Sequence, residues 1–269
     1  MNSFVRLAGD VPSIQKSFFR NLVAMLFAFI LLLRDREGWK VDRGSWPWLL
    51  LRAVFGTVGI LCNFYAVDHL VLADASMLNK MSPFFAIIFS WILLKERLSP
   101  VQALAVVVAF IGSLFIIRPT FSNMDLGASL IGLLGGFGAG VAYTIVRILS
   151  KRHVHNAMIV FVFSAFSCLV TLPYVLIVHA PMSAYQLICL LLAGLAAAGG
   201  QFSITAAYSF APARELSVYD YSQVIFSAIL GYFLFSQIPD GYSIIGYVLI
   251  CGTAVFMYFY NNRKHPVSS

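Results

Sequence analysis

The sequence predicts an all-α integral membrane protein, a helical bundle of nine full transmembrane helices plus a partial first helix, arranged as a five-plus-five inverted repeat. Three observations support this prediction. Of the 269 residues, 60% are hydrophobic and 11% are charged, whereas an ordinary soluble domain has about 45–50% apolar and about 25% charged residues. The apolar residues form successive long blocks, and the basic residues gather in alternate joints between them.

Each apolar block has roughly 17–25 residues, enough for an α-helix to cross a hydrocarbon core of about 30 Å. Lipid offers exposed backbone groups no hydrogen-bond partner and admits only helices or closed barrels, and blocks of this length favour helices. We expect Pro83, in the third block, to bend its helix and free a backbone carbonyl. The predicted helices cover residues 17–33, 47–67, 73–94, 101–118, 127–148, 157–178, 185–208, 215–235 and 241–260.

The segment NSFVRLA before the first full block is too short to cross a membrane. If residues 9–16 form an external joint, this segment is the outer end of a helix that rises from the cytoplasm. We expect the natural start to lie upstream of Met1, the alternative being a chain that inserts with nine spans and an exposed N-terminus. A signal peptide would need a longer apolar core.

Positive residues in short joints are retained on the cytoplasmic side of a membrane. The joints that follow the even-numbered blocks contain a single Lys or Arg between them, Arg118. We therefore predict a multi-pass protein of the cell membrane (inner or plasma membrane) with a cytoplasmic C-terminus. The formal charge of +7 lies in these joints and not along one face, so it does not indicate a nucleic-acid partner. The basic residues that follow the odd-numbered blocks are Arg34, Arg36, Lys40, Arg43, Lys95, Arg97, Arg147, Lys151, Arg152, Arg214, Arg263 and Lys264.

A weak internal repeat relates the two halves of the chain. A shift of 140 residues aligns residues 59–99 with residues 199–239 without a gap, and Gly59 then meets Gly199. Agreement of the block boundaries is better evidence than the few identities, because apolar sequences match by chance. Equivalent blocks are five crossings apart, so the copies have opposite orientations. Inverted repeats of this kind are typical of transporters with a site near the membrane midplane.

These residues resemble the drug/metabolite transporter superfamily, in its ten-helix EamA-type branch, from Phe4 to Lys264. The resemblance rests on FVRLAG…QKSFFRN, on NFYAVDHLVLADASML…SPFFAIIFSWILLKERLS with Pro83 inside a helix and Glu96 at its end, and on the glycine-punctuated helix closing each half. It implies a ten-helix inverted-repeat carrier that moves amino acids or similar small metabolites through a central cavity.

The resemblance also implies the division of the chain. Residues 1–118 form the first EamA-like repeat, with its first helix truncated, and residues 119–269 form the second. The sequence departs from the family pattern in that truncated helix and at Ser236, where a glutamate matching Glu96 is expected.

Three ionisable residues inside apolar blocks are candidates for function, because such a group costs about 2.5–3.5 kcal/mol at a helix centre. Arg20 either snorkels to the external surface or holds a carboxylate or phosphate at the outer mouth of a cavity. Lys80 lies about 10 Å below the outer end of its helix and should face protein or water. Asp220 is the repeat equivalent of Lys80, at similar depth from the opposite surface.

Lys80 and Asp220 form either one structural ion pair or the two ends of a substrate site. Their estimated vertical offset of about 13 Å exceeds what both side chains comfortably reach. We hypothesise that a zwitterionic solute fills the gap, with its carboxylate toward Lys80 and its ammonium toward Asp220. Alternatively, Asp220 binds a coupling proton.

Further polar and aromatic residues in the same blocks are predicted to line the cavity, where aromatic walls would suit a ligand with an apolar or planar part. The alternative for the tyrosines is an interfacial belt. The glycines of the fifth block recur every fourth residue and predict a seam for close helix packing. The predicted lining residues are Asn63, Tyr65, Asn79, Gln201, Tyr208, Tyr219, Tyr221 and Gln223, and the seam glycines are Gly132, Gly136 and Gly140.

The sequence therefore predicts a secondary carrier that moves a small metabolite, such as an amino acid, by alternating access between two inverted halves. No cofactor or metal is implied, since the cysteines and histidines lack ligand spacing and no nucleotide-binding loop is present. The implied partners are a small-molecule solute, membrane lipid and a coupling proton. Two alternatives are a membrane-embedded enzyme that acts on lipid and a non-transporting truncated remnant.

Overall fold

The computed structural model describes residues 1–95, 99–117, 126–178, 180–210, 223 and 226–264, and all regular structure in these residues is helical. The helices are α1 (Asn2–Leu7), α2 (Ser13–Arg34), α3 (Trp46–His69), α4 (Leu72–Asn79), α5 (Ser82–Leu94), α6 (Pro100–Ile117), α7 (Leu126–Lys151), α8 (Asn156–Val178), α9 (Ala184–Phe210), a short helix Phe226–Phe235, and α11 (Gly241–Lys264). Two 3₁₀ turns, Arg36–Trp39 and Arg43–Ser45, join α2 to α3.

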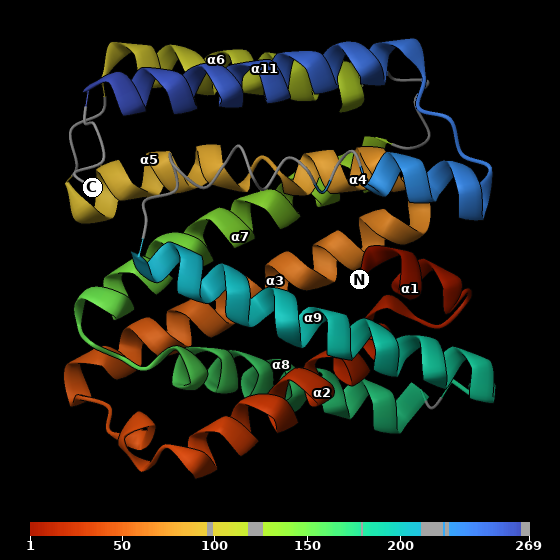
Figure 1. The fold of residues 1–269 in the computed structure, drawn as a ribbon. Coiled ribbons are helices and arrows are strands. Elements are labelled where there is room, and N and C mark those ends of the chain that lie inside the picture. Colours follow the sequence, from red (N-terminus) through yellow and green to blue (C-terminus); the bar gives the residue numbers. More distant parts are fainter. Residues whose placement is uncertain (96–98, 118–125, 179, 211–222, 224–225, 265–269) are drawn as a thin grey trace.

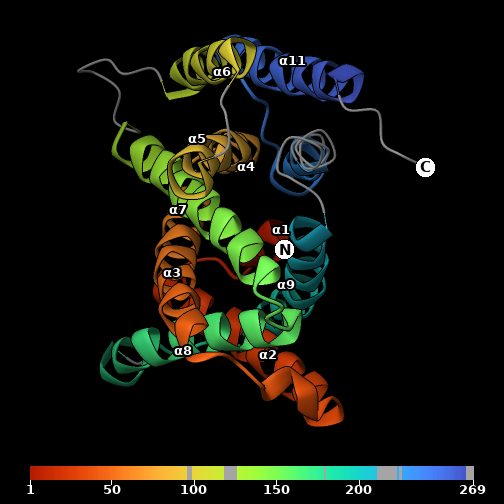
Figure 2. The ribbon, with the colours of Figure 1, turned by 90° about the vertical axis from the view of Figure 1, so that its left-hand side faces the viewer.

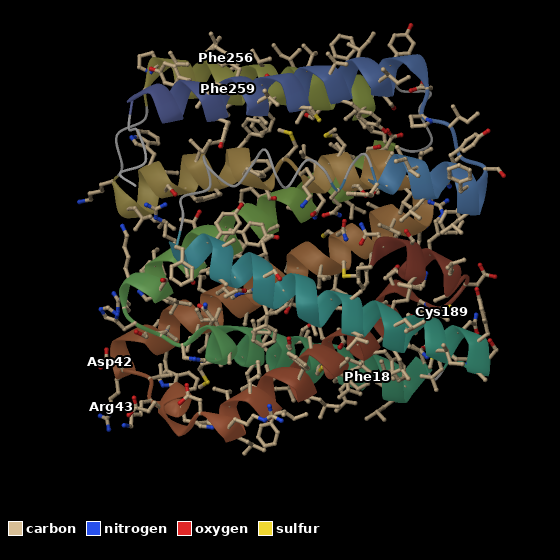
Figure 3. The ribbon with its side chains drawn as sticks, viewed as in Figure 1. Phe18, Asp42, Arg43, Cys189, Phe256 and Phe259 are labelled. Carbon is tan, nitrogen blue, oxygen red and sulfur yellow. The ribbon has the colours of Figure 1, made fainter. Side chains whose placement is uncertain are left out.

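The helical membrane fold predicted from the sequence is confirmed. Within the described residues, seven segments are long and apolar enough to cross a membrane, and two shorter apolar helices, Ala103–Ile116 and Phe226–Phe235, stand where the fourth and eighth blocks were predicted. Large apolar side chains cover the outside of the bundle, as a lipid-facing surface requires. Phe256 and Phe259 on α11 are examples, and Figure 3 shows them on the outer face.

The third predicted helix is not continuous, which corrects the expectation of one bent helix over 73–94. Helix α4 ends at Asn79 and α5 begins at Ser82, with Lys80 and Met81 between them. Pro83 lies in the first turn of α5, where its missing N–H leaves no hydrogen bond unmade. The proline therefore starts a new helix instead of bending an old one.

The helices pack in layers (Figure 1). Helices α6 and α11 lie side by side in an outer layer, followed by α4 and α5, then α3, α7 and α9, and finally α2 and α8. Helix α3 packs extensively on α7, α2 on α8, and α1 on α9. Figure 2, turned by 90°, shows α3, α7, α9 and the α2–α8 pair arranged around the middle of the molecule.

The basic joints lie at one end of the bundle. Helices α2, α5 and α7 all end at the left of Figure 1, whereas α3 and α8 end at the right. Figure 3 places Arg43 at the left end and Cys189 toward the right. The alternation of joints rich and poor in basic residues in the sequence therefore corresponds to two distinct ends of the fold.

The predicted glycine seam on α7 lies against the junction of α4 and α5. A Cβ at Gly136 would lie 2.5 Å from the carbonyl oxygen of Leu78, and a Cβ at Gly140 would lie 2.7 Å from that of Ser82. Both distances are shorter than non-bonded contacts allow, so only glycine lets the backbones approach this closely. The seam thus holds the segment that contains the helix break.

A second glycine face on α7 meets α3. A Cβ at Gly138 would lie 2.8 Å from the carbonyl oxygen of Phe55 and 3.0 Å from Cα of Gly59. Gly135 makes a similar approach to the backbone of Asn63. Helix α7 therefore touches α3 on one side and the α4–α5 junction on the other through backbone surfaces.

Candidate functional site

A cavity of about 330 Å³ lies within the bundle, at the lower end of the usual range for small-molecule sites. Small residues on three helices leave the space open, among them Gly56, Gly59, Ala142, Ala197 and Gly200. The polar described residues that line the cavity are Asn2, Ser3, Arg20, Arg52, Asn63, Asn79, Lys80, Tyr143, Gln201, Gln223 and Ser227. Apolar lining comes mainly from Ile60, Phe163, Ile204, Phe226 and Leu230.

The structure brings six of the predicted site residues together at this cavity. Two others, Tyr65 and Tyr208, do not line it, and Tyr219, Asp220 and Tyr221 lie outside the described residues. The six lining residues are Arg20, Asn63, Asn79, Lys80, Gln201 and Gln223.

Arg20 lies inside the protein, so the interpretation that it snorkels to the external surface is wrong. The residue is 3% exposed. One terminal nitrogen donates to Oδ1 of Asn21, and the other lies 3.4 Å from Oε1 of Gln201. Asn21 is fixed in turn because it donates to Oγ of Ser167 at 2.8 Å. This network ties α2 to α8 and α9 and directs the guanidinium into the cavity.

Arg52, on α3, is a second buried guanidinium that the sequence reasoning missed. It is 2% exposed, and its guanidinium carbon lies 4.0 Å from the ring centroid of Phe163. Its Nε and one terminal nitrogen have no hydrogen-bond partner among the described residues. An arginine within two turns of the start of an apolar block is ordinarily interpreted as a side chain that snorkels to the membrane surface. The signal available was the helical spacing of Arg52, Gly56 and Asn63, which puts one polar and glycine-rich stripe on a single face.

Lys80 and Asn79 reach the cavity from the break between α4 and α5. Lys80 is the C-terminal cap of α4, and its N–H donates to the carbonyl oxygen of Ser76 at 3.0 Å. Lys80 is buried and lines the cavity, as expected from its depth in the sequence. An end of a broken helix at membrane depth is tolerated where it lines a cavity.

Tyr65 and Tyr208, the two described tyrosines among the predicted site residues, lie away from the cavity. Tyr65 is 38% exposed on the outside of α3, where its ring stacks on His69 with centroids 4.0 Å apart. Tyr208 is buried behind Tyr143, with ring centroids 4.6 Å apart and planes 17° from parallel. Among the described tyrosines, Tyr143 on α7 is the one that lines the cavity. The presence of a tyrosine in a helix does not reveal which face of the helix carries it, so the sequence did not show that Tyr65 and Tyr208 point away from the cavity.

The cavity carries an excess of positive charge over the part of the chain that the structure describes. Arg20, Arg52 and Lys80 line it, and no Asp or Glu does so within that part. Amide side chains from Asn63 and Gln201 supply further donors and acceptors. The arrangement can bind a small polar solute, and its charge favours an anionic group.

A charged cluster lies where α1, α2 and α3 meet, at the end of the bundle where α3 ends. Nζ of Lys16 lies 2.5 Å from Oδ1 of Asp68, and Oγ of Ser13 donates to the other carboxylate oxygen at 2.7 Å. Arg6 donates to the carbonyl oxygens of Val67 and Leu70. Helices α1, α2 and α3 are thus joined at this end, although the sequence placed Lys16 in a joint.

Known proteins resemble this chain over nearly its whole length. Residues 3–118 and 126–259 match the EamA-like transporter family. The sequence is 36% identical over 255 residues to the pseudopaline exporter CntI of Pseudomonas aeruginosa, covering 93% of this chain and 88% of that protein. It is 27% identical over 267 residues to human solute carrier family 35 member G1, covering 94% and 73%. A solved crystal structure shares the fold, with a TM-score of 0.69 at 17% identity, covering 97% of this chain and 92% of the other.

Proposed function

Because the chain belongs to the EamA-like transporter family, we propose that it carries a small metabolite such as an amino acid across the cell membrane by alternating access between two inverted halves. It is a multi-pass membrane protein, and its relatives are named as transporters. This membership favours a carrier over a lipid-acting enzyme. One relative is named an exporter, and we extend that direction to this chain.

The observation that carries the proposal is the cavity of about 330 Å³ within the bundle, which is lined by both polar and apolar residues. Carriers place their site near the midplane, between repeats and next to broken helices. Here the break between α4 and α5 supplies Asn79 and Lys80 to the cavity. The same polar groups would be costly in lipid unless a solute or water used them.

The helix contacts support two inverted repeats, residues 1–118 and 119–269. Under this assignment α1, α2, α3 and α6 correspond to α7, α8, α9 and α11. The α2–α8 and α6–α11 contacts then join equivalent helices, and the α3–α7 contact has its counterpart in α9–α1. Likewise α3–α8 corresponds to α9–α2, and α2–α3 to α8–α9. A twofold relation predicts such exchanged pairs.

One pair of local contacts supports the same relation. Oγ of Ser209 donates to Oδ1 of Asn156 at 2.8 Å, which joins α9 to α8 as Asp68 joins α3 to Lys16 on α2. Lys16 and Asn156 are 140 residues apart, the shift found in the sequence, and Asp68 and Ser209 are 141 apart, one residue more. The basic joints at one end support a cytoplasmic C-terminus, because short positively charged joints stay inside.

Our proposals for the solute and the coupling ion rest on the charged residues Lys80 and Asp220. The zwitterion hypothesis assigns the carboxylate of the solute to Lys80 and its ammonium to Asp220, and the alternative assigns a coupling proton to Asp220. Transport driven by an imposed pH gradient would support proton coupling. Transport that is unchanged in Asp220→Asn at every pH would contradict both roles of Asp220.

Flux into proteoliposomes tests the carrier function. Purified protein is reconstituted, and counterflow of a panel of radiolabelled amino acids and related metabolites is compared with protein-free vesicles. We expect saturable flux of at least one solute. Ala196→Phe, which fills the cavity wall, should abolish it, whereas Leu195→Phe on the exposed neighbouring face should not. Equal flux in the two variants would contradict passage through this cavity.

A further inference from the structure

We propose that Arg20 and Arg52 together form an anion subsite that binds two carboxylate groups of one solute. The proposal rests on the proposed carrier function and narrows its substrate class to small solutes with two carboxylate groups, a class that includes acidic amino acids. Arg20 was a candidate site residue from the sequence, whereas Arg52 was identified only in the structure. Both are almost completely buried and both line the same cavity.

The two guanidinium groups face the same aromatic ring. The guanidinium carbon of Arg20 lies 5.7 Å from the centroid of Phe163, and that of Arg52 lies 4.0 Å from it. The two carbons are therefore at most 9.7 Å apart, the sum of these distances. Two positive charges this close repel each other in a medium of low dielectric constant. Binding of a dianion removes that repulsion and neutralises both charges.

Hydrogen-bond donors on both residues remain available. Nε of Arg20 and Nε and one terminal nitrogen of Arg52 are buried and have no partner among the described residues. Neither residue forms an ion pair with a described carboxylate. Buried donors of a charged group are normally satisfied, and exceptions on two neighbouring arginines indicate a ligand. A guanidinium presents a planar fork that matches a carboxylate with two parallel hydrogen bonds.

The backbone beside Arg52 is shaped for this arrangement. Gly56 follows Arg52 by one helical turn, and a Cβ at Gly56 would collide with the terminal nitrogen of Arg52 and lie 2.9 Å from the ring of Phe163. The missing side chain lets the guanidinium lie between the helix surface and the ring. The site is therefore built by Arg20, Arg52, Gly56 and Phe163, which lie on the three helices α2, α3 and α8.

The two arginines approach the ring from opposite ends of the bundle. Arg20 is seven residues from the start of α2 and Arg52 six residues from the start of α3, which corresponds to about 10 Å of rise from each end. Helix α2 starts at the right of Figure 1, and α3 starts at the left. A dianion between them would keep one arginine on each side as the cavity opens alternately.

Ligand-induced stabilisation of the purified protein tests the subsite. The probes are glutarate, its monoamide and glycerol 3-phosphate, each titrated up to 20 mM at constant ionic strength. We expect glutarate to raise the melting temperature by about 2 °C or more and the monoamide to raise it clearly less. No shift with glutarate, or an equal shift with the monoamide, overturns the proposal. A larger shift with glycerol 3-phosphate overturns the carboxylate assignment.

Matched variants locate the effect. Arg20→Gln and Arg52→Gln should each weaken glutarate binding at least about tenfold, whereas Arg34→Gln, an exposed arginine at the end of α2, should not. Arg52→Lys, which keeps the charge and loses the fork, should also bind more weakly than the parent protein. Equal weakening by Arg34→Gln would show a general charge effect and refute the subsite.

Stability without ligand separates a binding role from a structural one. A buried arginine without an anionic partner is costly, so Arg52→Met should melt at the same or a higher temperature than the parent protein. A clear decrease in its melting temperature would show that Arg52 is structural and overturn the proposal. If the protein transports other solutes but does not bind glutarate, the subsite is refuted and the carrier function stands. If it binds glutarate but transports no solute, the carrier function is refuted and the subsite stands.

Discussion

Nζ of Lys16 lies 2.5 Å from Oδ1 of Asp68, and this ion pair joins α2 to α3 at one end of the bundle. The two partners differ in environment, because Lys16 is 1% exposed and Asp68 is 19% exposed. In the proposed repeat, the contact that corresponds to this pair is an uncharged hydrogen bond between Asn156 and Ser209. Contacts of different chemistry therefore join α2 to α3 and α8 to α9.

Removing one charge of this pair should have unequal effects. We expect Asp68→Asn to lower the free energy of unfolding by about 3 kcal/mol, because it leaves a buried ammonium without a counter-charge. Lys16→Met should cost less, about 1 kcal/mol, because Asp68 keeps some exposure and a hydrogen bond from Ser13. Chemical unfolding in detergent micelles measures both. A larger effect of Lys16→Met would contradict this description of the pair.

Gly136→Ala should destabilise the protein by about 1–3 kcal/mol, because the new methyl group would lie 2.5 Å from the carbonyl oxygen of Leu78. Gly199→Ala is the matched control. No described atom lies within 4 Å of the new methyl group there, and alanine favours a helix by up to about 1 kcal/mol. Melting temperatures should therefore move in opposite directions. A shared direction would mean that α7 is not in close contact with the α4–α5 junction.

Tyr247→Phe should loosen α11 from α4. Oη of Tyr247 donates to Oδ1 of Asp74 at 2.6 Å, and loss of a hydrogen bond to a charged group costs about 1.5–3 kcal/mol. Tyr232→Phe, at an exposed tyrosine of the helix Phe226–Phe235, should have no measurable effect. Thermal unfolding of the two variants against the parent protein is the measurement. Identical melting curves for all three proteins would exclude a stabilising role for this bond.

Single cysteines at Lys95 and Ser236 should be labelled from opposite sides of the membrane. Both residues adopt a left-handed conformation, with φ of 52° in each, directly after the helices that end at Leu94 and Phe235. These helices are equivalent in the proposed repeat. A membrane-impermeant thiol reagent, applied to cells and to inverted vesicles of a variant without its native cysteines, gives the answer. Labelling of both positions from one side would refute the inverted topology.

The sequence was sufficient to predict the long helices because each of them is an apolar block with polar residues at its ends. Helices α2, α3, α7, α8 and α9 begin and end within a few residues of the predicted blocks. The seam of Gly136 and Gly140 was also predictable, since a spacing of four residues fixes one face of a helix. The break at Lys80 was not, because a proline is equally compatible with a kink and with a new first turn.

The candidate site was only partly predictable. Lys80 was expected in a cavity because of its depth, and the structure places it there. Arg52 was missed because distance from a helix end does not reveal whether a long side chain points outward to water or inward to protein. Tyr65 and Tyr208 show the same limit, since their positions depend on how each helix is rotated about its axis. Helix rotation is set by neighbours such as Gly59 and Gly138, which contact each other only in the folded chain.

The glycine contacts on α7 also constrain how the protein can move. A slide of α7 by one residue would bring Phe137 or Ala139 to positions where the backbones of α3 and of the α4–α5 junction leave no room for a Cβ. These helices therefore cannot slide past one another along their axes. Any movement between the proposed halves has to tilt about these backbone contacts, because a tilt keeps each glycine opposite its neighbour.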